Sequence, residues 1–528
     1  MTITKLISEK RLFILLLVLS PLPVWIVPYF LTADGPCHAY NARILYDMLH
    51  GRADFYQQFY YLNTAPEPNW FSHALLLFLF HICGPVLAEK LIVTSAIILF
   101  TAGFRKLLLA LSKENSFLSL WAFPFVWQAA LLMGFYNYMF GISCSFFISA
   151  WFITNYKHFR ARNLLLLALA FSSLYFMHLF GCLVAFIICG LYILTDTGKV
   201  KVKVKHLGVL LLSALPCILL ILNYLLDNSG SASTNNSSRL PKEELVSNLN
   251  NLSSLYGLTT LDIRMAMKMS SLLQVFIAIG LALFALRKPN RHVFIPGFLF
   301  VLFTAAYFLL PEMTFGGSFL RQRIEPLIYL SGLVIISFAR IPNAIRIGSI
   351  CFSVFFSLAF SFNKISSYRE ASLFVSEIRE ISTRVRDKSL VLPLNFEHYL
   401  QNTNGELINK KTLLFGHVVE AMPHNKQLIF LENYEANTGY FPLIWKGEKN
   451  PFLHLSVNDG IEAEPPQVDI IGYNTNVQPI NYILTWGKRK EALEHPSYPA
   501  LIQTVTENYT LVYTSPVYKI SLYELKKR

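Results

Sequence analysis

Residues 12–31 read LFILLLVLSPLPVWIVPYFL, an apolar run long enough to cross a bilayer as one helix. Lys5, Lys10 and Arg11 precede this run, and basic residues beside a first span tend to stay in the cytoplasm. No small-residue cleavage site follows, so we interpret the run as a transmembrane helix and not as a signal peptide. The segment after Leu31 is therefore expected outside the cytoplasm.

Similar apolar runs recur up to about Phe362, whereas charged and polar residues recur every few positions from Asn363 onward. The run at 70–83 is short for a span, so we expect an interfacial or re-entrant helix that is only partly inserted. The runs long enough to span are 12–31, 89–110, 117–133, 139–156, 163–180, 182–196, 207–226, 269–286, 293–310, 324–339 and 345–362. These runs predict a mainly α-helical, polytopic membrane bundle of about eleven spans.

The sequence divides into a transmembrane part, 1–362, and a small soluble α/β domain, 363–528. In the soluble part an amphipathic helix is predicted at 368–386, because apolar residues repeat there at helical spacing. Strands are predicted at 390–394, 428–431 and 482–486, with a hairpin over 509–525. Two outer loops are long, at 32–70 and 227–268. The second is rich in Ser and Asn with a short helix expected at 241–256, and the sequence leaves open whether it is a lid or partly disordered.

The net charge of +13 follows the membrane topology. Basic residues form short clusters after every second apolar run, which is the positive-inside pattern and not the single basic surface that nucleic-acid binding needs. With 54% hydrophobic and only 15% charged residues, the chain is not expected to be soluble. We predict a cytoplasmic N-terminus, a periplasmic C-terminal domain and a bacterial inner membrane location. No nucleic-acid partner is expected.

Cysteine usage gives no sign of a disulfide framework. Of the seven cysteines, only Cys37 lies in a predicted loop, and residues 363–528 contain none. The soluble domain must therefore be held by an ordinary core or by docking to the membrane part.

The first outer loop opens with Asp34-Gly35-Pro36-Cys37-His38. A carboxylate at the boundary of lipid and water is partly desolvated, which raises its basicity and favours a general base. His38 follows at the helical spacing of four residues, so the two side chains could act as base and orienting partner, or as two ligands of a divalent metal. The alternative is that Asp34 caps a helix and His38 is a surface residue.

This order of features resembles the GT-C superfamily of membrane glycosyltransferases, which includes protein O-mannosyltransferases, lipid A aminoarabinose transferases and oligosaccharyltransferases. Members share a first span, a long outer loop that begins with an essential acid, many further spans and often a soluble C-terminal domain. Asp34 matches the acid by position. The stretch 66–70, Pro-Glu-Pro-Asn-Trp, is loosely similar to the end of that loop, although the Lys-Pro-Pro of some members is missing. On this resemblance we expect Glu67 to contact substrate.

The resemblance departs from the family at the second outer loop. Where members carry another acid, this chain has Asn137, which is neutral and weakens the inference of a two-acid metal site. Asn137 is instead expected to orient substrate. His178, at the outer end of a span, could face the same cavity, although a packed, hydrogen-bonded histidine is the commoner case.

The loop before the tenth span contains Arg321 and Arg323, in a position similar to the arginine-containing entry to a late helix of GT-C enzymes. An arginine at an outer helix end offers a forked donor that suits a phosphate. The alternatives are an interfacial anchor or an ion-pair partner for Glu325. In the soluble part, Glu397, His398, His417 and His424 show no metal-ligand spacing and are interpreted as surface residues.

These observations favour an inverting glycosyltransferase that uses a polyprenyl-phosphate sugar donor and a glycan, lipid or protein acceptor on the outer face of the membrane. Asp34 would remove the acceptor proton and an arginine would hold the leaving phosphate. No cofactor is required by the pattern, and a divalent metal remains open. Two other hypotheses are a transporter or lipid flippase, and a non-catalytic scaffold or sensor acting through its soluble domain.

Overall fold

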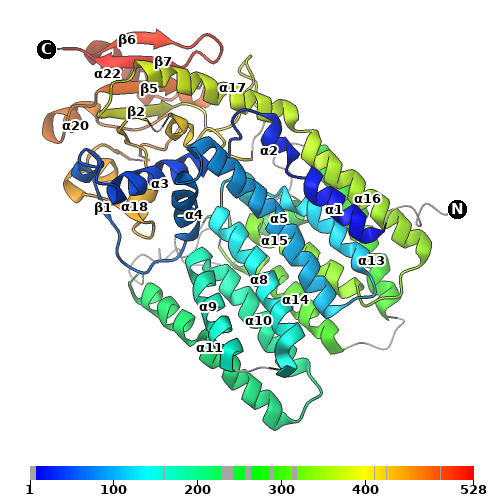
Figure 1. Cartoon of the computed structure of the whole chain (residues 1–528). Coiled ribbons are helices and arrows are strands. Elements are labelled where there is room, and N and C mark those ends of the chain that lie inside the picture. Colours follow the sequence, from blue (N-terminus) through cyan, green and yellow to red (C-terminus); the bar gives the residue numbers. More distant parts are fainter. Residues whose placement is uncertain are drawn as a thin grey trace.

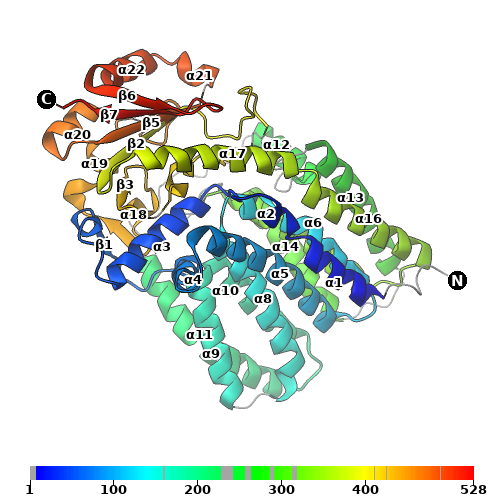
Figure 2. The same cartoon turned by 45° about the horizontal axis from the view of Figure 1, so that its top comes forward.

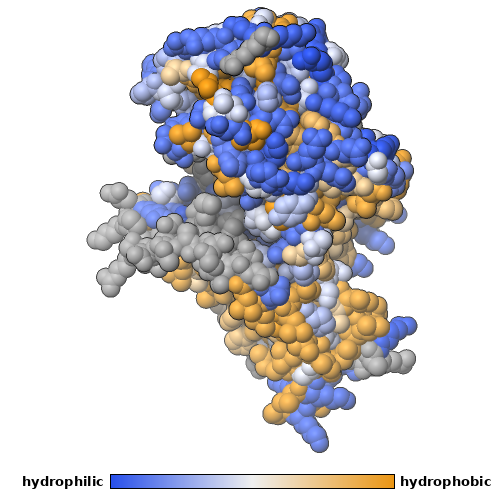
Figure 3. Space-filling view, turned by 90° about the vertical axis from the view of Figure 1, so that its left-hand side faces the viewer, coloured by the Kyte–Doolittle hydropathy of each residue, from blue (hydrophilic) through white to orange (hydrophobic). Residues whose placement is uncertain are grey.

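A computed structural model describes residues 8–158, 161–227, 242–255, 263–285, 291–311, 318–408, 411–423, 425–458, 460–487 and 489–527. Helices form an elongated bundle, and a small sheet with its covering helices lies at one end (Figure 1). The space-filling view shows apolar residues gathered over the helical part and hydrophilic residues over the end that carries the sheet (Figure 3).

Within the described residues, six helices are long and apolar enough to cross a membrane. They are α5 (Pro85–Leu111), α8 (Tyr136–Asn155), α11 (Val200–Asp227), α13 (Ile263–Ala285), α14 (Phe294–Leu309) and α16 (Asn343–Phe362). Three shorter helices pack among them: α9 (Ala161–Met177), α10 (Leu179–Thr195) and α15 (Leu320–Ile336). The chain is thus an integral membrane protein in which helices lie at nine of the eleven predicted runs as expected, while the count of eleven spans stays a prediction.

The two other predicted spans are not continuous helices. The run at 12–31 forms α1 (Glu9–Leu19) and α2 (Leu22–Ile26), which separate at Ser20 and Pro21. The run at 117–133 forms a 3-10 turn and two short helices, α6 (Ala122–Val126) and α7 (Ala129–Leu132). Proline has no N–H for the helical ladder, so the prolines in both runs explain why the expectation of single helices was wrong.

The short run at 70–83 folds as α4 (Phe71–Phe80), as expected of a segment too short to span. The helix expected at 241–256 is α12 (Lys242–Ser254). The other parts of that outer loop, 228–241 and 256–262, lie outside the described residues.

Residues 363–528 contain a five-stranded sheet in the order β3-β2-β5-β7-β6. Its strands are β2 (Ser389–Asn395), β3 (Leu428–Phe430), β5 (Tyr482–Trp486), β6 (Tyr509–Thr514) and β7 (Ser521–Leu525). The strands β3, β2 and β5 are parallel, and β7 is antiparallel to both β5 and β6. The long α17 (Ile365–Ile381) continues from α16 and lies along the sheet (Figure 2). All four predicted strand regions and the amphipathic helix are confirmed.

Smaller helices complete this end of the molecule: α18 (Glu435–Thr438), α19 (Pro451–His454), α20 (Ile470–Asn476), α21 (Lys490–Leu493) and α22 (Ser497–Asn508).

The segment 32–70, predicted as the first outer loop, packs against residues 363–528. Its helix α3 (Gly35–Leu49) lies beside α18, and its strand β1 (Tyr60–Leu62) pairs with β4 (Leu443–Trp445). The ring of Tyr60 packs on Trp445 with centroids 4.3 Å apart. One hydrophobic core contains residues of this loop, such as Ile44 and Phe59, together with residues from the sheet. Residues 32–70 (the loop) and 363–528 (the tail) therefore form one packed unit at one end of the helical bundle, and we call it the outer unit.

Candidate active site

A cavity of about 850 Å³ lies between the packed outer unit and the membrane helices. Its polar wall includes Asp34, Asn137, His178, Arg323, His417 and Tyr434. Its apolar wall comes from α9, α10 and α11, through Phe171, Leu183, Phe186, Ala214, Ile218 and Ile221. The cavity thus has a polar end at the outer unit and an apolar extension between the membrane helices, which we call the apolar arm.

Asp34 stands immediately before α3, but its side chain does not cap that helix. The backbone N–H of Asp34 donates to the carbonyl of Met133 at 3.0 Å, which ties the residue to the turn after α7. Gly134 in that turn has φ +84°, and a Cβ there would lie 3.2 Å from the Cβ of Asp34. Glycine is therefore needed for so close an approach. The turn leaves the Asp34 carboxyl facing the cavity.

The surroundings of Asp34 give its carboxyl a high affinity for protons. Burial raises the pKa of Asp34 to about 7, against the lowering effect of His38 and Arg323. Tyr434 lies beside the carboxyl in the cavity wall, and Nε2 of His417 lies 4.0 Å from Oδ1. Burial lowers the pKa of His417 to about 3, so this ring is neutral at neutral pH. A carboxylate with these properties is suited to accept a proton.

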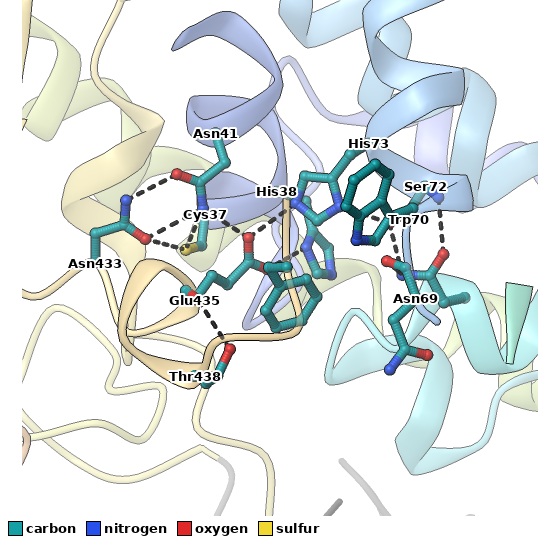
Figure 4. Close-up of polar contacts among 12 residues, drawn as sticks. Cys37, His38, Asn41, Asn69, Trp70, Ser72, His73, Asn433, Glu435 and Thr438 are labelled. Carbon is teal, nitrogen blue, oxygen red and sulfur yellow. Dashed lines mark hydrogen bonds and ion pairs between the residues drawn. The ribbon is translucent and has the colours of Figure 1, made fainter. Parts of the chain in front are cut away.

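His38 also lines the cavity but is bound to other groups. Its Nε2 lies 3.0 Å from the carbonyl oxygen of Gly134, and its Nδ1 contacts the carboxylate of Glu435. Burial lowers the pKa of His38, but Glu435 outweighs this effect and raises the pKa to about 8. Figure 4 shows the Glu435 carboxylate facing both His38 and His73, and Nε2 of His73 lies 2.8 Å from it. The carboxylate partner of His38 is therefore Glu435 of the tail, and not Asp34 as the sequence suggested.

These three side chains are also the candidate metal ligands. Among the residues that the structure describes, His38, His73 and Glu435 form a group whose ligand atoms all lie within 4.8 Å of one another. Asp34 is not a member of this group. Asn137, where the family has a second acid, accepts from the N–H of Ser72 at 2.8 Å and donates to the carbonyl of Asn69 at 2.7 Å. Its amide therefore fixes the start of α4.

Arg323 enters the cavity from α15. Its guanidinium carbon lies 4.1 Å from the ring centre of Phe135, and Nη1 lies 3.2 Å from Nε2 of His178. Within the described chain, Nε of Arg323 has no hydrogen-bond partner although it is buried. A buried donor without a partner is costly, so it marks a place where a ligand oxygen would be stabilised. His178 lies in the cavity wall, as expected. Its Nδ1 accepts from the N–H of Phe180, so its Nε2 carries the ring proton and does not accept from the guanidinium.

The other two predicted contacts lie away from the cavity. Arg321, two residues before Arg323, forms an ion pair with Glu244 of α12 at 2.8 Å. Glu67 is buried, and it is not one of the cavity-lining residues, although its neighbours Pro68 and Asn69 are. The structure therefore brings Asp34, His38, Asn137, His178 and Arg323 to one cavity, and leaves these two outside it.

Several tail residues were wrongly interpreted as exposed. His398 and His417 line the cavity, and Glu397 is buried; His424 lies outside the described residues. The reason is that the tail packs on the first outer loop, so polar groups of the tail face the inside of the molecule. Tyr434 and Glu435 were missed because no spacing in the sequence connects them with Asp34 or His38.

Comparisons with protein-family models and with curated proteins found no match. Among solved structures, two cryo-EM classes of a mutant of the mycobacterial arabinofuranosyltransferase AftD are similar, with TM-scores of 0.48 and 0.47 and sequence identities of 12% and 13%. Each match covers 98% of this chain and 42% of that chain. The chain therefore spans less than half the length of that enzyme.

Proposed function

We propose that the protein is a membrane glycosyltransferase that moves a sugar from a polyprenyl-phosphate donor to a hydroxyl of a glycan, lipid or protein acceptor. The reaction would take place on the outer face of a bacterial inner membrane. The observation that carries the proposal is the shared cavity, in which a proton-accepting carboxyl, Asp34, and a half-buried arginine, Arg323, lie at one end of an apolar arm.

The apolar arm accounts for the lipid part of the donor. Phe171, Phe186 and Ile218 belong to three different membrane helices, and together they offer a hydrocarbon surface open to the cavity. A polyprenyl chain buries apolar area there, at about 25 cal/mol per Å². Water-soluble nucleotide sugars have no group that would use this surface.

The residues at the polar end of the cavity account for the reaction. Asp34 accepts the proton of the acceptor hydroxyl as its oxygen bonds to the anomeric carbon, and the bond from that carbon to the donor phosphate oxygen breaks. Arg323 binds the polyprenyl phosphate and stabilises the negative charge that it gains on leaving. Attack from the face opposite the phosphate inverts the anomeric centre. His178 lies beside the guanidinium, and Tyr434 and His417 lie beside the carboxyl.

The test is transfer of radiolabelled sugar by protein purified in lipid nanodiscs, with a panel of polyprenyl-phosphate sugars and acceptors. Asp34→Asn keeps the shape of the side chain but removes the base, so we expect the turnover rate to fall by about 10²–10⁴-fold. Asp54→Asn, an exposed acid of the same outer loop, is the matched control and should keep full turnover. Equal transfer by wild type and Asp34→Asn would remove Asp34 from the reaction. No transfer from any donor, with lipid movement across liposomes instead, would favour a flippase.

A further inference from the structure

Three buried side chains from distant parts of the chain meet beside the cavity. His38 comes from α3, His73 from α4 and Glu435 from α18, and their exposed fractions are 4%, 0% and 0%. The Nε2 atom of His73 lies 2.8 Å from the Glu435 carboxylate, and Nδ1 of His38 contacts the other carboxylate oxygen. Two imidazoles and a carboxylate are the donors that zinc takes in many three-residue protein sites.

The contacts of His38 require a positive charge between its ring and Glu435. The carbonyl oxygen of Gly134 can only accept, so the Nε2 atom 3.0 Å from it carries the ring proton. In a neutral imidazole the other nitrogen, Nδ1, then presents a lone pair directly to a carboxylate. Two electron-rich atoms repel at that separation unless a positive species lies between them. That species is either a second proton on His38 or a metal ion.

The third side chain adds a further possible metal ligand. A metal ion, unlike a single proton, can be shared by all three residues, whose ligand atoms lie within 4.8 Å of one another. A zinc ion holds its nitrogen and oxygen ligands at about 2.0–2.2 Å, which places neighbouring ligand atoms about 3.3 Å apart.

The surroundings also resemble those of a metal site. Ligating histidines usually donate their other N–H to a backbone carbonyl or a carboxylate, as His38 does to Gly134. The ligating carboxylate is hydrogen-bonded in turn, and Asn41 donates to Glu435 at 2.6 Å. These contacts fix the ring tautomer and the carboxylate orientation before any ion binds.

We propose that His38, His73 and Glu435 bind one Zn²⁺ ion that fastens the tail to the first outer loop. The site is buried and does not include Asp34, and it joins segments nearly 400 residues apart in the sequence. The proposal goes beyond the glycosyltransferase reaction and does not depend on it, because it is tested by metal content.

The experiment measures metal in untagged full-length protein, purified without chelators, by inductively coupled plasma mass spectrometry. We expect about one zinc per chain in wild type, and less than about a tenth of that in His73→Ala and in Glu435→Gln. His50→Ala, an exposed histidine at the end of α3, is the matched control and should keep its zinc. Cobalt exchanged into wild type should show the visible absorption of a tetrahedral site.

Wild type alone gives a second measurement that does not require a folded variant. Treatment with a strong chelator should lower its melting temperature and increase protease cleavage within the outer loop and the tail. Added Zn²⁺ should restore the melting temperature and the resistance to protease. Wild type that contains no zinc and binds none on titration would overturn the proposal in favour of a protonated His38. Equal zinc in wild type and His73→Ala would overturn it as well.

Discussion

Replacing Arg323 by Ala should weaken binding of the lipid-linked donor far more than the same change at Arg321. The guanidinium of Arg323 lines the cavity and has a buried, unpartnered Nε, whereas Arg321 is paired with Glu244 away from the cavity. A hydrogen bond to a charged group contributes about 1.5–3 kcal/mol, and a forked contact with phosphate makes two of them. Allowing for incomplete desolvation, we expect a loss of about 3–4 kcal/mol, or about 10²–10³-fold in Kd.

The assay is equilibrium binding of a fluorescent polyprenyl phosphate to protein in nanodiscs. Arg323→Lys keeps the charge but loses the fork, so it should weaken binding by about 10-fold, between wild type and Arg323→Ala. Arg321→Ala should bind within about twofold of wild type. Melting temperatures of the ligand-free variants verify that each is folded. If Arg321→Ala loses as much affinity as Arg323→Ala, or neither variant loses any, the assignment of the phosphate to the cavity arginine is refuted.

Three further predictions concern the apolar arm, the tail and the outer loop. Ile218→Trp should fill the apolar arm and raise the KM for a long-chain donor by about 10-fold while leaving a two-isoprene donor unaffected; equal KM values for both donors would contradict this. Burial raises the pKa of Glu464, but His398 and Arg489 outweigh it and lower the pKa to about 2, below its ordinary value of 4.5. The stabilisation is therefore present above pH 4.5 and lost as pH falls towards 2, so Glu464→Gln should melt earlier than wild type at pH 7 and together with it near pH 2. Tyr60→Ala removes a buried ring from the β1–β4 contact and should lower the free energy of unfolding of the outer unit by about 3 kcal/mol, measured by denaturant titration; a loss below about 1 kcal/mol would show that this contact does not hold the loop.

The membrane helices were the most predictable part of the fold. Long apolar runs such as those of α5 and α11 specify helices by length and composition alone, because a bilayer leaves few other structures for them. The broken segments around Pro21 and Pro124 were mispredicted although both prolines are visible in the sequence. An apolar sequence predicts that a segment enters the membrane. It does not predict whether neighbouring helices will stabilise a helix whose backbone hydrogen bonds are interrupted by proline.

The candidate site was predictable only in part. The order of features along the chain correctly suggested that Asp34 and Arg323 would share a cavity, because both follow or begin apolar runs on the same predicted side. The sequence could not show which of Arg321 and Arg323 lines the cavity, because that depends on which face of α15 turns towards α12. The tail residues, above all Glu435, are brought to the site by packing that no local pattern records.

The most direct test of the central claim is a cryo-EM structure with a non-hydrolysable polyprenyl-phosphonate sugar. We predict that the phosphonate lies within hydrogen-bond distance of Arg323, the sugar within reach of the Asp34 carboxyl, and the lipid chain between α9, α10 and α11. Density for the lipid head group at another surface, with the cavity between Asp34 and Arg323 filled only by water, would contradict the account.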